Sequence, residues 1–208
     1  MGLTLYYRGM LDDLEQTAFL INELREIAEI CGWENGSLDE DWTLPPQARV
    51  VVLPGLSDYR IVGHLALKGV EILPHPCCEP VSFYFDRQGT LWSVPGRALS
   101  LDQRERPDQA FLSVKTQFAP AEIHVAIVKL LRYIKGRYIS NLEVRDEGGF
   151  WETGDIVELE RRRESINRAL DMLKHALSAT EVLPSTLRSA EQVLRLVEDT
   201  LNRKGLHE

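Results

Sequence analysis

Two stretches of the sequence gather side chains that could take part in chemistry. The first is residues 146–155, DEGGFWETGD, in which four acidic and two aromatic side chains surround three glycines. Paired carboxylates can exchange protons with a substrate or hold a divalent ion, and a nearby aromatic ring can raise a carboxyl pKa. The stretch lacks the spacing of a calcium-binding loop. A glycine-rich turn before a helix capped by Asp155 explains it without chemistry.

The second stretch is residues 72–80, ILPHPCCEP, which contains His75, Cys77, Cys78 and Glu79. Structural zinc takes four Cys or His ligands, and adjacent residues of an extended chain point to opposite faces. Two neighbouring cysteines therefore do not easily reach one ion, and two small buried or half-buried thiols beside a chain reversal are the favoured interpretation. His75 and Glu79 are the candidate metal ligands of this stretch.

Further candidate site residues lie near the ends of predicted elements. His124 lies at the border between the apolar and polar faces of the helix predicted after Pro120, where its ring could reach a cleft or simply be half-buried. In an enzyme, His124 or Glu147 would act as general base, while Asp146 and other carboxylates would hold an ion or orient the substrate. The candidate ligand-binding residues are Lys115, Gln117, Trp151 and Glu152.

The first 55 residues have the pattern of a strand, a long helix and a second strand. Residues 3–9, LTLYYRG, have the β-branched and aromatic content of a strand. Apolar residues then recur every three or four positions from Leu14 to Ile30, which predicts an amphipathic helix capped by Asp12 or Asp13 and ended by Gly32. The apolar run at residues 48–55 predicts an interior strand.

The middle of the chain has the pattern of a sheet followed by a linker. Residues 64–74 alternate loosely, and Gly69 indicates a bulge or a close approach of two backbones. Residues 82–94, SFYFDRQGTLWSV, are typical of a β-hairpin with Asp86 and Gly89 in its turn. Residues 95–110 lose all apolar periodicity, which predicts a long surface loop.

The opening pattern recurs later, because residues 111–147 again read strand, long helix, strand. Residues 3–55 and 111–147 are therefore interpreted as an internal duplication. We predict an α+β domain over residues 1–150, with a mostly antiparallel sheet and two long helices on one face. In pattern this resembles the layout of ferredoxin-like or TATA-binding-protein-like folds.

The C-terminal residues 151–208 are predicted to form an antiparallel helical hairpin, with helices at 156–178 and 185–203. Apolar residues keep alternating three- and four-residue spacing in both segments, although Arg163 occupies one core-type position. The apolar stripes are wider than a two-helix seam, so a further surface must cover them. Either the main domain or the hairpin of a second chain can do so, and a homodimer is favoured slightly.

Composition narrows the function classes. The chain has 208 residues, of which 44% are hydrophobic, and a formal net charge of −8. Residues 1–47 hold ten acidic residues and two arginines, which argues against a nucleic-acid partner at that surface. Three cysteines are a poor basis for a disulfide framework, so a cytoplasmic location is expected. No stretch resembles a signal peptide or a membrane span.

Two functional hypotheses remain open from the sequence. The first is a cytoplasmic, non-catalytic binding or assembly protein that self-associates or binds a protein partner through its helical hairpin, without a cofactor. The second is a small hydrolase or metal-assisted enzyme, which would use a divalent ion. It requires His75 or His124 to lie within bonding distance of Asp146, Glu147 or Glu152 in a concave pocket.

Overall fold

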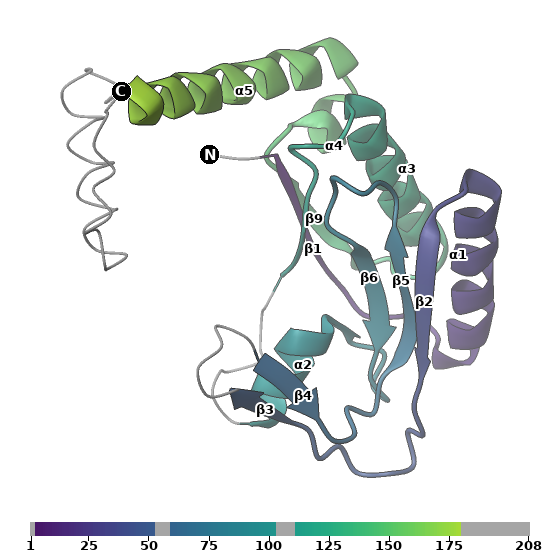
Figure 1. Ribbon diagram of the computed structural model, residues 1–208. Helices are drawn as coiled ribbons and strands as arrows, with labels where there is room; N and C mark the ends of the chain where they lie inside the picture. Colours follow the sequence, from purple (N-terminus) through teal and green to yellow (C-terminus); the bar gives the residue numbers. More distant parts are fainter. Residues whose placement is uncertain (1–2, 53–58, 103–110, 180–208) are drawn as a thin grey trace. The chain divides into compact units, whose positions relative to one another are not determined.

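The computed structural model describes residues 3–52, 59–102 and 111–179 (Figure 1). The chain divides into two units, residues 1–160 and 161–208, with the boundary inside helix α5 (Ile156–Ala179). The described part of the first unit is a mixed α+β fold with antiparallel sheets and several helices, as predicted.

A three-stranded sheet lies in the order β8-β1-β9, formed by β8 (Leu112–Lys115), β1 (Thr4–Arg8) and β9 (Glu143–Asp146). The central strand β1 is antiparallel to both neighbours. β8 and β9 are therefore parallel to each other, and helix α3 (Ala121–Arg137) connects them. This is a split β-α-β unit, the arrangement that underlies ferredoxin-like folds.

A four-stranded antiparallel sheet lies in the order β2-β5-β6-β7, formed by β2 (Glu34–Asp39), β5 (Lys68–Leu73), β6 (Val81–Phe85) and β7 (Leu91–Trp92). The predicted hairpin is present as β6 and β7, with Asp86 and Gly89 in its turn. Gly69 lies where two backbones approach closely, since an added Cβ would be 2.0 Å from the carbonyl oxygen of Phe83.

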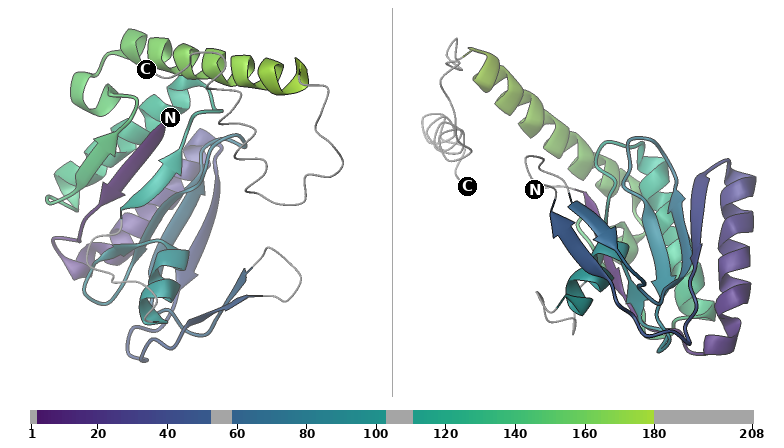
Figure 2. Two further views of the ribbon diagram at one scale, coloured as in Figure 1. Left: turned by 90° about the vertical axis from the view of Figure 1, so that its left-hand side faces the viewer. Right: turned by 60° about the horizontal axis from the view of Figure 1, so that its bottom comes forward.

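The two predicted repeats differ in the structure, because the strand that follows α1 is β2, at residues 34–39, and not the strand predicted at residues 48–55. In the first repeat, helix α1 (Thr17–Cys31) connects β1 to β2, and these strands belong to different sheets. In the second repeat, helix α3 connects β8 to β9, and these strands share one sheet. Figures 1 and 2 show α1 and α3 next to each other on one side of the strands. The Glu23 carboxylate of α1 accepts hydrogen bonds from the hydroxyls of Tyr133 and Tyr138.

Helix α1 has the predicted ends but a different buried stripe. Asp13 accepts a hydrogen bond from the Glu15 N–H and caps the 3-10 turn η1 (Leu14–Gln16), and Gly32 ends α1 in the left-handed conformation at φ 66°. The buried residues of α1 are Thr17, Leu20, Leu24 and Ala28. Ile30, predicted to be buried, is 85% exposed because the buried face runs along these four positions.

Two expectations for the middle of the chain were wrong. The run at residues 48–55 contains β3 (Arg49–Val52), whose one partner strand among the described residues is β4 (Tyr59–Val62). The described side chains of β3 are partly exposed, so it is not the interior strand that was expected. The predicted loop at 95–110 begins instead with helix α2 (Val94–Leu101), which the Ser93 hydroxyl caps. Proline is compatible with the first helical turn, and Pro95 therefore signals a start rather than a break.

The main core lies between the three-stranded sheet and β6. Leu5 and Tyr7 of β1 are fully buried, and the Tyr7 and Phe83 ring centroids are 6.0 Å apart. The Tyr7 hydroxyl donates a hydrogen bond to the Ser82 carbonyl and accepts one from the Ser82 N–H, each 2.9 Å long. A single buried hydroxyl thus joins β1 to β6.

Replacing Tyr7 by phenylalanine is expected to lower the free energy of unfolding by about 1–3 kcal/mol, because it leaves the buried N–H and carbonyl of Ser82 unpaired. Denaturant unfolding measures the difference. Tyr6→Phe is the matched control, since Tyr6 faces the other side of the same strand and is only partly buried. Equal stability of Tyr7→Phe and wild type would contradict the assignment of this bond.

Helix α5 is confirmed as a 24-residue helix from Ile156 to Ala179, begun by Asp155, whose carboxylate accepts from the N–H groups of Val157 and Glu158. The second helix of the predicted hairpin, residues 185–203, lies outside the described residues. No helix in the described ranges is long and apolar enough to cross a membrane.

Candidate functional site

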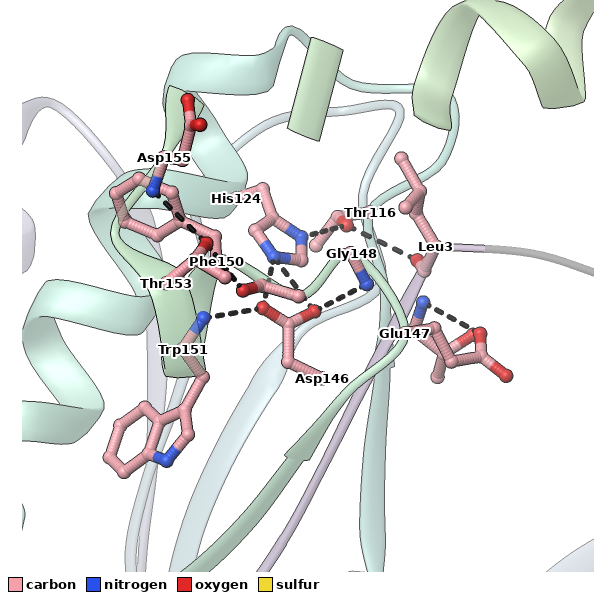
Figure 3. Close-up of polar contacts among 12 residues, drawn as sticks. Leu3, Thr116, His124, Asp146, Glu147, Gly148, Phe150, Trp151, Thr153 and Asp155 are labelled. Atoms are coloured by element: carbon pink, nitrogen blue, oxygen red, sulfur yellow. Dashed lines mark hydrogen bonds and ion pairs between the residues drawn. The ribbon is translucent and has the colours of Figure 1, made fainter. Parts of the chain in front are cut away.

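The strand order brings three chain segments together at one edge of the three-stranded sheet. β8 and β9 run parallel, and both end where β1 begins, since Thr4 pairs with Lys115 and Leu5 pairs with Asp146. Helix α3 starts a few residues after β8 and returns the chain toward β9. Thr116, His124 and Asp146 meet at this edge, although 22 residues separate His124 from Asp146 in the sequence (Figure 3).

His124 and Asp146 form a buried pair. Nε2 of His124 is 3.1 Å from each carboxylate oxygen of Asp146, and the two side chains are 2% and 0% exposed. Because a carboxylate accepts hydrogen bonds, the proton on Nε2 points to Asp146. Two of the predicted catalytic residues are therefore within bonding distance, but they face the interior of the protein.

The other ring nitrogen of His124 is also occupied. Nδ1 is 2.8 Å from the hydroxyl oxygen of Thr116, which in turn is 3.2 Å from the carbonyl oxygen of Leu3. If the Thr116 hydroxyl donates to Nδ1, the ring is neutral; if it donates to Leu3, Nδ1 donates to Thr116 and the ring is charged. In both cases no ring nitrogen is left to exchange a proton with a substrate.

The turn after β9 supplies further donors to Asp146. The Gly148 N–H lies 2.6 Å from one carboxylate oxygen and the Trp151 N–H lies 2.8 Å from the other. Gly149 has φ 74° and lets the chain turn into the short helix α4 (Phe150–Thr153). A Cβ on Gly148 would lie 3.1 Å from the His124 ring and 2.7 Å from Leu159. Because Gly148 has no side chain, the turn after β9 can pack directly against the His124 ring.

The electrostatics of Asp146 follow from these contacts. Burial alone would raise the pKa of its carboxyl, but the hydrogen bond and charge of His124, together with the N–H groups of Trp151 and Gly148, outweigh burial and lower the pKa below its ordinary value. The carboxylate is ionised at neutral pH and fully hydrogen-bonded. A buried ion pair whose hydrogen-bonding atoms all have partners is expected to stabilise the fold.

A cavity of about 310 Å³ lies on the outer face of this sheet, lined by Tyr6, Phe111, Arg145, Asp146 and Glu147. The guanidinium carbons of Arg8 and Arg145 each lie 4.5 Å from the centre of the Phe111 ring. Arg8 also forms an ion pair with Glu143. The cavity is thus lined by two aromatic residues, one arginine and two acidic residues, and His124 is not among them.

The other candidate residues in the stretch 146–155 lie apart from the His124–Asp146 pair. The Glu147 carboxylate accepts from the Thr4 N–H at 3.0 Å, across the sheet edge from His124. Figure 3 shows the Trp151 indole pointing away from His124, and the Arg132 guanidinium lies 5.5 Å from its ring centre. Glu152 is exposed. The structure therefore brings Asp146, but neither Glu147 nor Glu152, to the histidine.

Lys115 and Gln117 do not share a strand face. β8 ends at Lys115, whose ammonium lies 5.6 Å from the Phe118 ring centre. Gln117 lies in the following turn and is 3% exposed. The regular strand expected through Gln117 is broken by the turn in which Ala119 N–H donates to the Thr116 carbonyl.

His75 and Glu79 also make local contacts. Nδ1 of His75 accepts from the Cys77 N–H, and the Glu79 carboxylate accepts from the Lys115 N–H. Cys77 is exposed and Cys78 is buried, and burial raises the pKa of the Cys78 thiol to about 12. Within the described ranges, no three His, Cys, Asp or Glu residues are grouped closely enough to hold a metal ion.

Thr116 is the member of the buried cluster that the sequence did not reveal. A threonine at the end of a strand is common, and its role depends on His124 lying one helical turn after Pro120. The only local signal is the eight-residue separation, which spans a turn and the start of a helix. Tyr6, Phe111 and Arg145 were missed for a similar reason, since they meet only through strand pairing.

Comparison of the chain with protein families, with curated proteins and with solved structures gave no match.

Proposed function

We propose that the protein is a non-catalytic binding or assembly protein, which self-associates or binds a protein partner through its C-terminal helical region. The observation that carries the proposal is helix α5, a 24-residue helix with apolar residues at three- and four-residue spacing. Such a pattern is typical of helices that bury one face against another helix. Association with a second copy of this chain is the arrangement that we put to the test.

The exposure of side chains along α5 supports an interface. In the apolar stripe of α5, Ile156 is 40% exposed and Ile166 is only partly buried. Leu159, in contrast, is fully buried in the first unit. Apolar side chains that stay exposed in one chain are expected at a surface that another chain covers.

The state of the histidine supports a role without catalysis. The one His–carboxylate pair at the predicted site is buried, and each of its polar atoms has an intramolecular partner. A general base needs an accessible atom within hydrogen-bond distance of its substrate. The three cysteines are unpaired, which is consistent with a reducing, cytoplasmic location. The acidic N-terminal region is consistent with a partner other than nucleic acid.

Sedimentation of the full chain tests the self-association. We expect the wild type to be a dimer and Ile166→Glu to raise the dimer dissociation constant at least about tenfold, because a charge would be buried at the contact. Ser165→Glu is the matched control, since it adds the same charge at the neighbouring exposed position. Circular dichroism verifies that both variants fold.

A wild type that stays monomeric at all accessible protein concentrations would overturn the self-association. So would equal dissociation constants for Ile166→Glu and Ser165→Glu, because the apolar stripe would then have no part in the contact. Retention of the dimer in both variants would place the contact elsewhere on the molecule.

A further inference from the structure

We propose a second interaction surface, the outer edge of β2, which binds an extended basic segment of a partner protein by strand addition. This surface belongs to the first unit and does not depend on association through α5. In strand addition the backbone of the partner forms hydrogen bonds with a free sheet edge, and alternate side chains give specificity. The argument rests on the geometry, exposure and charge of β2.

β2 is the outermost strand on its side of the four-stranded sheet. It pairs with β5 over six consecutive residues, from Glu34 opposite Leu73 to Asp39 opposite Lys68, without a bulge. Figure 1 shows β2 at the front of the sheet, and the left view of Figure 2 shows it at the rim with α1 behind the sheet. Helix α1 therefore packs on the face of β2, and within the described part of the chain no strand pairs with its outer edge.

The edge lacks the usual protection against pairing. Natural edge strands are commonly protected by proline, lysine or a bulge. β2 has the sequence ENGSLD, with neither proline nor lysine, and every residue except Leu38 is exposed. A Cβ on Gly36 would meet no atom within 4 Å, so the face of the sheet at the middle of β2 is open. With six residues in continuous register, the strand is long enough to accept another strand.

The charge of the edge selects a basic occupant and disfavours a second copy. Glu34 and Asp39 lie at the two ends of β2, and Asp41 follows shortly after. Asp39 already forms an ion pair with Lys68, so Glu34 and Asp41 are the acidic groups left for an occupant. Hydrogen bonds from Thr43 are the main reason that the pKa of Asp41 is lowered, so it stays ionised. Antiparallel pairing of two β2 strands about their centre would place Glu34 opposite Asp39, and like charges directly opposite each other are unfavourable.

A groove beside the edge accommodates side chains of the added strand. A cavity of about 460 Å³ lies between α1 and the end of β2. Its lining combines the apolar residues Ala18, Ile21, Leu38 and Trp42 with the charged residues Glu15, Arg25, Asp39 and Lys68. Side chains alternate between the two faces of a strand. An occupant with apolar residues at alternate positions would place one of them in this groove and its basic residues toward Glu34 and Asp41.

Peptide binding to the full chain tests the proposal. The probe is a fluorescent peptide of sequence KVTVKVTK, and its matched control is EVTVEVTE. We expect the basic peptide to bind with a dissociation constant on the order of 100 μM and the acidic peptide to bind at least about tenfold more weakly. Hydrogen exchange should show that the basic peptide slows exchange of amides in residues 34–39. Equal binding of the two peptides, or no slowing there, would overturn the proposal.

Proline substitution separates edge pairing from charge attraction. Successive N–H groups of a strand point to opposite sides, so either Gly36→Pro or Ser37→Pro removes an outward N–H and preserves the bonds to β5. Of these two variants, the one whose thermal unfolding midpoint stays close to that of the wild type has kept its bonds to β5. This variant should bind KVTVKVTK at least about tenfold more weakly than the wild type does. Undiminished binding by this variant would show that the peptide does not pair with the edge.

Two further variants complete the test. Glu34→Gln is expected to weaken peptide binding about threefold, whereas Glu26→Gln, an exposed change on α1, should leave it unchanged. Ile166→Glu should also leave peptide binding unchanged, so failure of the α5 proposal and failure of the β2 proposal are distinguishable. If the stable proline variant instead lowers the mass in solution and KVTVKVTK does not bind, the edge pairs with a second copy and the proposal is wrong.

Discussion

Replacing Asp146 by alanine is expected to lower the free energy of unfolding by about 3–5 kcal/mol, the range typical of breaking a buried charged pair. The carboxylate accepts from Nε2 of His124 and from the N–H groups of Gly148 and Trp151, and all these donors would lose their acceptor. Each unsatisfied buried donor costs about 1–3 kcal/mol in its own right. The substitution therefore affects the sheet edge, α3 and the turn at once.

Thermal unfolding provides the measurement, with an expected fall in the midpoint of roughly 10 °C for a chain of this size. Glu152→Ala is the matched control, because Glu152 lies in the same segment but is exposed, and its effect should stay within about 0.5 kcal/mol. A similar midpoint for Asp146→Ala and wild type would contradict the structural role of the pair.

The same carboxylate gives the fold a defined pH dependence. The pKa of Asp146 is lowered in the folded state, mainly by His124 acting against burial, whereas in the unfolded chain it is about 3.9. The stability that the ionised Asp146 carboxylate adds to the fold is therefore complete above the unfolded pKa. It is lost as the pH falls through the folded pKa. The difference in unfolding free energy between wild type and Asp146→Asn should narrow as the pH falls below the unfolded pKa and through the lower folded pKa. A constant difference would show that Asp146 is not the titrating group.

Replacing Gly69 by alanine is expected to cost more than about 3 kcal/mol, because the added methyl has no room. It would lie 2.0 Å from the Phe83 carbonyl oxygen and 2.6 Å from the Tyr84 Cα, both of which belong to the backbone of β6. Backbone atoms cannot rotate away as a side chain does, so β5 and β6 would have to separate. Both strands are central in the four-stranded sheet.

Gly36→Ala is a matched control on the neighbouring strand, because a Cβ there would meet nothing within 4 Å. Alanine is favoured over glycine inside a strand by about 0.5–1 kcal/mol, so this variant should be as stable as wild type or slightly more stable. Denaturant unfolding of the two variants compares the same chemical change in two environments. Equal effects would show that the close approach at Gly69 is not present.

The candidate site was only partly predictable from the sequence. The stretch at 146–155 and His124 were both identified, because acidic residues beside glycines and a histidine at a helix border are visible locally. Their contact was not predictable, since it depends on β8 and β9 lying on either side of β1. Thr116 and the burial of the pair follow from the same strand order. Residues that could take part in chemistry can be identified from the local sequence, whereas their accessibility depends on the segments that pack over them in the folded chain.

The sequence by itself determined those features of the fold that depend on residues close together in the chain. The positions of α1 and α3, the hairpin of β6 and β7, the end of α1 at Gly32 and the close approach at Gly69 all follow from periodicity and from the geometry that glycine permits. Tertiary structure alone decided which strands pair, that β1 and β2 belong to different sheets, and that Ile30 faces solvent. The physical reason is that backbone preferences act within a few residues, whereas strand pairing and burial depend on which distant segments can pack together.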